Sequence, residues 1–452
     1  MTAGPDIAAG RLDAEALARN FADAHPPLDR STALIEAARC YFCYDAPCVE
    51  ACPTSIDIPA FIRSIASGNV KGAATTILGA NIMGGMCARV CPVEELCEEA
   101  CVRNTHEDKP VAIGALQRFA TDHLFAAGIQ PFTRAPATGK RVAVVGAGPA
   151  GLSCAHRLAV LGHAVTVFEA RPKGGGLNEY GIAAYKTVDG FAQKEVAFIL
   201  SVGGIELRLG QALGRDITLA GLRRDYDAVF LGTGQTGVRA LGLEGEGMAG
   251  VLNAVDAIAA LRQADDKRTL PVGRRVVVIG GGNTAIDIAT QSKLLGADEV
   301  TLVYRRGPEQ MPATVKEQAW TQSHGVKIQF WAQPRSLQGW PAADGATAVK
   351  EVTFEYTQLD ASGRLAGTGD TVSLLADQVF KAVGQVLVPS ALGDAADLLE
   401  IAGDRIVVND DRQTSLPDVF AGGDCIAGLD LTVQAVADGK AAAEAIHRRL
   451  GG

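Results

Sequence analysis

The chain has 452 residues, of which 48% are hydrophobic and 21% are charged, and its formal net charge at pH 7 is −9. This composition excludes a disordered chain, and the negative charge, with no basic stripe, argues against nonspecific binding of nucleic acid. The first residues lack the apolar core of an export signal, and no apolar run reaches the roughly 18 residues that span a membrane. The sequence therefore predicts two or three domains in the reducing cytoplasm, with neither nucleic acid nor membrane as a partner.

Cysteines are concentrated near the N-terminus, where eight of the ten lie within residues 40–101. Disulfides are poor candidates in a reducing compartment, and zinc sites favour short Cys pairs, of which this region has only Cys40-x2-Cys43. Two groups of cysteines, each with a Cys-Pro step, are instead typical of ferredoxins with two clusters. The pattern favours two [4Fe-4S] clusters over zinc or free thiols. It runs Cys40-x2-Cys43-x4-Cys48-x3-Cys52-Pro53 and then Cys87-x3-Cys91-Pro92-x4-Cys97-x3-Cys101.

The surroundings of these cysteines are predicted to be helical. Apolar residues recur at helical spacing over residues 58–67, 71–78 and 113–126, and residues 128–139 have the composition of a linker. We therefore expect an α-helical domain that holds the clusters between its helices.

A dinucleotide-binding motif follows this linker. An apolar strand predicted over residues 142–145 leads into Gly146, Gly148 and Gly151 in G-x-G-x-x-G spacing, with Ala150 before the third glycine. Such glycines allow a tight turn, close approach of a pyrophosphate and close helix packing, with the phosphates at the helix N-terminus. A helix over 152–161 and a strand over 164–168 complete the unit, and Glu169 is placed to accept hydrogen bonds from a ribose. The alternative is a glycine-rich turn kept for packing, and the motif does not distinguish FAD from NAD.

A second motif of this kind lies further along the chain. A strand predicted over residues 275–279 precedes Gly280 and Gly282, and Asn283 and Thr284 begin the next helix, which is followed by a strand over 299–304. Two dinucleotide units beside a cluster domain indicate a hydride donor and a hydride acceptor. A duplication kept for packing alone is the alternative.

Arg305 and Arg306 stand after this second unit, where an NAD site would have an acidic residue. Two guanidiniums suit a 2′-phosphate and therefore favour NADPH. The alternative is that they pair with acidic neighbours such as Glu309.

Several segments resemble the N-terminal half of dihydropyrimidine dehydrogenase, and more narrowly the small bacterial subunit that carries only that half. The small subunit of glutamate synthase shares the plan, but its cluster loops differ. The resemblance covers nearly the whole chain. It is carried by Cys40-Tyr-Phe-Cys-Tyr-Asp-Ala-Pro-Cys48, by Cys52-Pro-Thr-Ser-Ile-Asp-Ile-Pro59 and by Gly114-Ala-Leu-Gln-Arg-Phe-Ala120.

The resemblance implies a ligand set for each cluster. Without it, Cys87 would be the eighth ligand and Gln117 a solvated glutamine. A neutral oxygen in place of a thiolate removes a negative charge and by itself raises the potential of that cluster. The implied sets are Cys40, Cys43, Cys48 and Cys101 for one cluster, and Cys52, Cys91, Cys97 and the side-chain oxygen of Gln117 for the other.

The resemblance also implies residues that contact the flavin. A helix predicted over residues 432–448 would point its N-terminus at the flavin, where its dipole stabilises negative charge. Lys186 would lie between the flavin and the nearest cluster, and a solvated surface lysine is the alternative. The implied flavin residues, beyond those of the glycine motif, are Gly176, Leu177, Lys186, Gly423, Asp424 and Thr432.

We therefore predict an α-helical two-[4Fe-4S] domain (1–135) followed by two α/β Rossmann-like domains. The FAD domain (136–250 and 375–452) is interrupted by the NAD(P) domain (251–374). The resemblance implies the electron-input subunit of dihydropyrimidine dehydrogenase, which passes electrons from NAD(P)H through FAD and the clusters. No side-chain acid or base is required for this chemistry.

A partner is predicted because nothing in the sequence suggests eight β-α repeats. In the family, an FMN in a (β/α)8 barrel reduces uracil or thymine. We therefore expect a hetero-oligomer with an FMN-containing large subunit. The alternatives are the NADPH-oxidising small subunit of glutamate synthase and a redox-sensing binding module, and the intact glycine loops disfavour the module.

Overall fold

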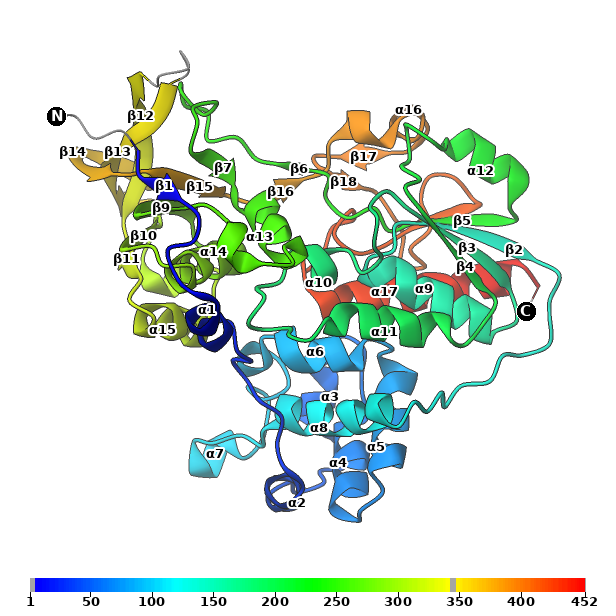
Figure 1. Cartoon of the computed structure of the whole chain (residues 1–452). Coiled ribbons are helices and arrows are strands. Elements are labelled where there is room, and N and C mark those ends of the chain that lie inside the picture. The colour runs from blue at the N-terminus through cyan, green and yellow to red at the C-terminus, as the bar shows by residue number, and fades with distance from the viewer. Residues whose placement is uncertain (1–4, 342–346, 452) are drawn as a thin grey trace. The chain divides into compact units, whose positions relative to one another are not determined.

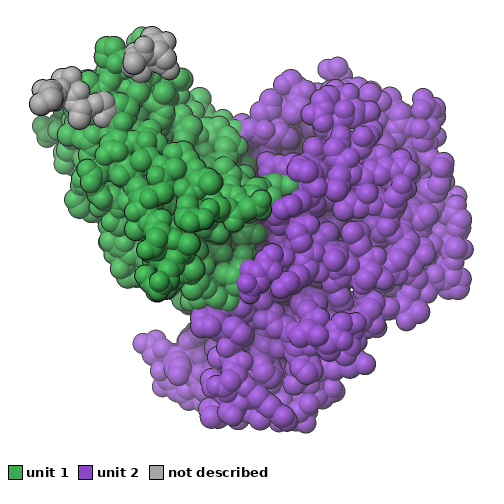
Figure 2. All heavy atoms as spheres, in the orientation of Figure 1, with its two compact units in different colours: residues 1–24, 180–188, 238–385 green, residues 25–179, 189–237, 386–452 purple. Residues whose placement is uncertain are grey.

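The computed structural model describes residues 5–341 and 347–451. These residues form two compact units (Figure 2). Unit 1 comprises residues 1–24, 180–188 and 238–385, and unit 2 comprises residues 25–179, 189–237 and 386–452. In the described residues, no helix combines the length and the apolar character that a membrane span requires.

The N-terminal part of unit 2 is a helical bundle around one apolar core (Figure 1). The predicted helices are confirmed, because α4, α5 and α8 occupy these positions and bury Phe61, Ile77 and Leu116 completely. Side-chain caps begin two of them: Asp57 accepts from Ala60 N at 3.0 Å, and Asn69 accepts from Gly72 N at 2.9 Å. The helices are α2 (Arg30–Ala38), α3 (Pro47–Glu50), α4 (Ile58–Ala66), α5 (Val70–Ala80), α6 (Gly84–Val90), η1 (Val93–Glu95), α7 (Asn104–Glu107) and α8 (Ile113–Ala126).

The rest of unit 2 is a five-stranded parallel sheet of order β19-β5-β2-β3-β4. Val142 and Val144 of β2 face the side covered by α9, α11 and α17, whereas Ala143 and Val145 face α12. The strands are β2 (Arg141–Val145), β3 (Ala164–Glu169), β4 (Ile205–Leu209), β5 (Ala228–Leu231) and β19 (Val419–Ala421), and the helices are α9 (Pro149–Val160), α11 (Phe191–Leu200), α12 (Leu219–Asp225) and α17 (Thr432–Arg449).

Unit 1 contains a second five-stranded parallel sheet, of order β11-β10-β9-β15-β7. Its strands are β7 (Val251–Asn253), β9 (Arg275–Gly280), β10 (Glu299–Val303), β11 (Lys327–Gln329) and β15 (Gln378–Ala382). Its helices are α13 (Ala254–Gln263), α14 (Asn283–Leu294) and α15 (Val315–Ser323). An antiparallel sheet of β12 (Ala332–Pro341), β13 (Thr347–Leu359) and β14 (Leu365–Leu375) completes the described core.

Two segments belong to unit 1 although the predicted limits place them elsewhere. Strand β15 pairs with β9 and β7, so the chain leaves this sheet after residue 382 and not at 375. Residues 7–8 form β1, which pairs with β8 (Val272–Gly273), and α1 (Ala14–Asn20) follows, so residues 5–24 lie with the second sheet and not in the helical bundle. These differences have one cause: a short apolar strand or helix does not specify which sheet it joins.

The remaining elements are short. They are α10 (Leu177–Tyr180), β6 (Gly237–Val238), η2 (Lys267–Thr269), η3 (Pro308–Gln310), β16 (Gln385–Val386), η4 (Pro389–Leu392), α16 (Ala395–Leu398), β17 (Ile401–Ala402) and β18 (Arg405–Ile406). The order of helical bundle, first parallel sheet and inserted second sheet confirms the predicted fold class.

Candidate cofactor sites

The first candidate cluster site is a small cavity in the helical bundle. Burial raises the pKa of Cys40, and it raises the pKa of Cys48 to about 12, so these thiols are protonated when no cation is present. Iron would release these protons, because thiolates and not thiols are metal ligands. The four cysteines that line the cavity are those of the first predicted set, Cys40, Cys43, Cys48 and Cys101.

The second candidate cluster site is a neighbouring small cavity. A hydrogen bond with Cys87, together with burial, raises the pKa of Cys91 well above its ordinary value, and burial also raises the pKa of Cys97. Ile58 of α4 lines both cavities. The second cavity is lined by the whole second predicted set, Cys52, Cys91, Cys97 and Gln117, and also by Cys87.

In each of the two cavities, the cysteine thiols line an open space. Among the described residues, no three His, Cys, Asp or Glu side chains converge as closely as a single metal ion requires. A soft thiolate set around a cavity fits an iron–sulfur cluster, whose ligands bind separate iron atoms.

Gln117 and Cys87 compete for the eighth ligand position. Gln117 is 7% exposed, so it is not a solvated glutamine. Its Nε2 donates to Gly84 O at 2.6 Å, which leaves Oε1 as the atom available to a ligand in the cavity. Cys87 is a buried free thiol that is hydrogen-bonded to Cys91. Both residues line the cavity, and the assignment of Gln117 as the ligand stays a prediction.

The first glycine loop has the tight geometry that its motif predicts. Gly146 has φ +99°, and a Cβ there would lie 2.3 Å from Gly232 O. A Cβ on Gly151 would lie 1.9 Å from Gly146 O, so both positions require glycine. A Cβ on Gly176 would lie 2.7 Å from the Cα of Gly148, which means that two backbones meet without side chains between them.

The N-terminus of α9 is open to an anion. Gly148 is its N-cap and provides no side-chain hydrogen bond, and Ala150 in the first turn is small and buried. The free N–H groups and the helix dipole suit a pyrophosphate. Leu177, which begins α10, directly follows Gly176.

Glu169 lies at the end of β3 and is buried. Its carboxylate accepts from Ala147 N and from Arg171 N, each at 2.8 Å. A carboxylate has about four acceptor positions, so two remain for ribose hydroxyls. Its predicted contact with a ribose is therefore compatible with these bonds.

The C-terminal segment packs against the first glycine loop. A Cβ on Gly423 would lie 3.0 Å from the Cβ of Ala150, and Gly423 N donates to Asp438 at 3.1 Å. Burial raises the pKa of Asp424 to about 6. Thr432 Oγ1 donates to Asn178 at 2.9 Å at the start of α17. The sequence analysis did not identify Asn178 or Asp438, because a buried polar residue in a helix has no local pattern.

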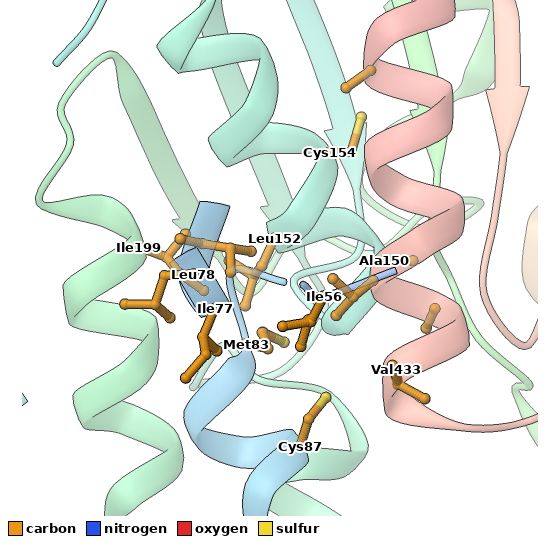
Figure 3. Close-up of a cluster of buried hydrophobic side chains, with 14 of the residues drawn as sticks. Ile56, Ile77, Leu78, Met83, Cys87, Ala150, Leu152, Cys154, Ile199 and Val433 are labelled. Carbon is orange, nitrogen blue, oxygen red and sulfur yellow. The ribbon is translucent and has the colours of Figure 1, made fainter. Parts of the chain in front are cut away.

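Helix α17 links this site to the second cluster cavity. Val433, in its first turn, lines that cavity together with Cys87 and Ile56. Figure 3 shows Val433 on α17, Cys87 on α6, and Ala150 of the glycine loop in the same apolar cluster. The helix predicted to face the flavin therefore borders the second cluster cavity.

The second glycine loop lies in unit 1. Gly280 has φ +150° and a Cβ there would lie 2.2 Å from Ala382 O, so this turn also requires glycine. Gly282 caps α14 without a side-chain bond, and Asn283 and Thr284 form the first turn. This N-terminus offers free N–H groups to phosphates as α9 does.

The two arginines after β10 differ in exposure. Arg305 is exposed, whereas Arg306 is half-buried and its Nε has no hydrogen-bond partner in the described structure. Their role in reading a phosphate stays a prediction.

Lys186 is not a surface lysine, since its side chain is 10% exposed. Its Nζ lies 2.8 Å from both Asp287 of α14 and Glu317 of α15, and all three residues belong to unit 1. Burial alone would lower the pKa of Lys186, but Asp287 and its other neighbours raise it. Two carboxylates pair with this charge, and the role of Lys186 beside the flavin stays a prediction.

Family comparisons agree with this arrangement. Residues 17–129 match the family described as dihydropyrimidine dehydrogenase domain II, 4Fe-4S cluster, and residues 140–439 match the pyridine nucleotide-disulphide oxidoreductases. The PreT subunit of NAD-dependent dihydropyrimidine dehydrogenase from Salmonella typhimurium is 38% identical over 418 residues, which are 92% of this chain and 94% of that protein. The chain belongs to the PreT family.

Relatives with other names share the same plan. The small chain of glutamate synthase [NADPH] from Escherichia coli is 36% identical over 454 residues, which cover 95% of this chain and 94% of that protein. FprA from Mycobacterium tuberculosis superposes with a TM-score of 0.58 at 20% identity, over 70% of this chain and 85% of that one, and shows the fold alone. The chain is thus an oxidoreductase with a 4Fe-4S domain and an FAD and NAD(P) domain pair.

Proposed function

We propose that this chain is the electron-input subunit of a dihydropyrimidine dehydrogenase. One observation carries the proposal. Val433 of α17, the helix predicted to face the flavin, lines the second cluster cavity, and Ile58 lines both cluster cavities. The three sites therefore form a continuous series inside unit 2.

The order of the three sites predicts the order in which electrons would pass through them. The first turn of α14 would hold the nicotinamide dinucleotide that supplies a hydride, and FAD held at the first glycine loop would supply the conversion of that two-electron hydride into single electrons. The second cavity, with Cys52 and Gln117, receives them first because α17 borders it. The first cavity follows and is the exit. The protein contributes the binding geometry and excludes water, since both cavities are lined mainly by apolar side chains and thiols.

A partner completes the reaction. The relatives are named as a subunit of dihydropyrimidine dehydrogenase and as a small chain of glutamate synthase, so each works beside another chain. Reduction of a pyrimidine 5,6 double bond requires a hydride donor beside the ring, and the described sites are assigned to FAD, NAD(P) and the clusters. We infer an FMN-containing (β/α)8-barrel partner that takes electrons from the first cluster.

The dinucleotide is proposed to be NADPH. The half-buried guanidinium of Arg306 has an Nε without a partner in the described structure, and a 2′-phosphate would satisfy it. The names of the relatives divide on this point, since PreT is named NAD-dependent and the glutamate synthase chain is named with NADPH.

The glutamate synthase small chain is the second candidate function. It is supported by 36% identity over nearly the same length. The two candidates differ in the partner, so a partner assay separates them.

The test combines composition and turnover. The purified chain should contain iron and sulfide near eight of each, oxidise NAD(P)H with ferricyanide, and show no uracil-dependent oxidation. Adding the FMN-containing large subunit should start uracil-dependent oxidation. Uracil turnover by the chain alone, or activation only by a glutamine-dependent large subunit, would overturn the proposal.

A further inference from the structure

Asn81 is a buried polar residue in the wall of the second cluster cavity. It follows the last turn of α5, has an exposed fraction of 0%, and lines the cavity together with Cys52, Cys91 and Cys97. Asparagine is mostly found at protein surfaces, so complete burial here requires an explanation.

All polar atoms of Asn81 but one are paired. Its backbone N–H donates to Ile77 O at 2.8 Å, and its carbonyl accepts from Gly84 N at 2.9 Å. Its side-chain Oδ1 accepts from Met83 N at 3.0 Å. Nδ2 has no partner in the part of the chain that the structure describes.

An unpaired buried donor is costly. Leaving such a group unsatisfied costs about 1–3 kcal/mol, which the protein would avoid by placing an apolar side chain there. The bond from Met83 N fixes which amide atom is Oδ1, so the donor cannot be exchanged for the acceptor by a flip of the amide. Nδ2 is therefore kept as a donor beside a cavity whose other lining groups are apolar side chains, thiols and the amide of Gln117.

We propose that Asn81 Nδ2 donates a hydrogen bond to a sulfur of the second cluster and thereby sets the potential of that cluster. The acceptor is an inorganic sulfide or a cysteine thiolate. The inference rests on the proposed function, because it requires the cluster in this cavity. Asn81 contacts the cluster through this hydrogen bond and is not itself a ligand of its iron.

The direction of the effect follows from charge. Reduction adds one negative charge to the cluster, and a donor that faces its sulfur stabilises the reduced form more than the oxidised form. Asn81 therefore raises the potential, in the same direction as the neutral ligand Gln117. Together they make this cluster the better acceptor beside α17.

The test is a redox titration of the two clusters, monitored by EPR, in the loaded wild type and three variants. Asn81→Leu removes the donor at similar size, and Asn81→Asp replaces it with a charge. Asn69→Ala is the matched control, because it weakens the other end of the same helix without lining the cavity. Iron content and the two EPR signals of the wild type test the cluster assignment separately.

The Leu variant should keep its iron and shift the reduction equilibrium of one cluster roughly tenfold, which is about 59 mV lower for one electron. The Asp variant should shift it further, and Asn69→Ala should leave both potentials unchanged. Unchanged potentials in the Leu variant would overturn the proposal.

A second measurement covers the case in which the Leu variant does not bind iron. In wild-type protein labelled with 15N in asparagine side chains, pulsed EPR of the reduced cluster should detect a coupled 15N nucleus. Its absence in a protein with both clusters would also overturn the proposal.

Discussion

Glu195 provides a prediction whose size follows from its surroundings. It lies on α11 with an exposed fraction of 1%. Its Oε1 accepts from Met86 N at 3.0 Å, and its Oε2 has no partner in the described structure. Burial raises the pKa of Glu195 to about 8, against the opposing effect of Arg89. Arg89 does not compensate fully, because it is already paired with Asp122 of α8 at 2.7 Å.

The sign of the pH dependence is fixed by the raised pKa. An unfolded chain loses this proton near pH 4.5, whereas the folded chain keeps it until about pH 8. Between these values the folded state holds the extra proton, so the free energy of unfolding falls as the pH rises, by about 1.4 kcal/mol per pH unit. Over the whole window, this loss is at most on the order of 5 kcal/mol.

Glu195→Gln removes the titration and keeps the acceptor for Met86. We expect the melting temperature of the variant to exceed that of the wild type by an amount that grows from pH 5 to pH 9. Glu206→Gln is the control, because the side chain of Glu206 is 59% exposed. An infrared band of a protonated carboxyl should titrate near pH 8 in the wild type and be absent from Glu195→Gln. An equal difference in melting temperature at both pH values, or no such band, would refute the reasoning.

Three further predictions concern the cofactor sites. Cys87→Ala should leave both cluster EPR signals intact, whereas Gln117→Ala should perturb or remove one, and the opposite result would make Cys87 the ligand. Arg306→Ala should reduce the rate of flavin reduction by NADPH and leave the rate with NADH unchanged, and a wild type tenfold faster with NADH would contradict this. Gly439→Ala should lower the melting temperature and release flavin more readily, because the new Cβ would lie 2.1 Å from a backbone oxygen of α9. In comparison, Gly79→Ala, where nothing lies within 4 Å, should be neutral.

Helices and strands could be predicted from local sequence patterns. Features that depend on contacts between residues far apart in the chain could not. Helix α8 spans Ile113–Ala126 as its apolar spacing predicts, because that period depends on neighbours in the same helix. Strand β15 pairs with β9 in the second sheet, and its sequence alone does not show this, since a strand with apolar residues on both faces fits either sheet. The ion pairs of Lys186 with Asp287 and Glu317 join residues far apart in the chain and leave no local signal.

The candidate cofactor sites show the same difference between local patterns, which the sequence reveals, and distant contacts, which it does not. Glycine spacing identified both loops, and cysteine spacing indicated two clusters, because the chemistry itself requires those residues at close intervals, whereas the ligand set of each cluster came from the resemblance. The resemblance, and not the spacing, pointed to Gln117. Asn81 was not identified, because an asparagine at a helix end usually serves as a cap or faces solvent, and only the tertiary structure shows it fully buried.

The first parallel sheet is built from two parts of the chain that are far apart in the sequence, and this affects how the chain folds during synthesis. Strands β2, β3, β4 and β5 are synthesised in succession, but β19, which pairs with β5, and α17, which covers the sheet, follow only after the whole of the second sheet. At about 5–20 residues per second, the ribosome leaves the open edge of β5 unpaired for many seconds. The nascent chain therefore exposes an apolar strand edge during this interval, after all residues of the helical bundle have been synthesised.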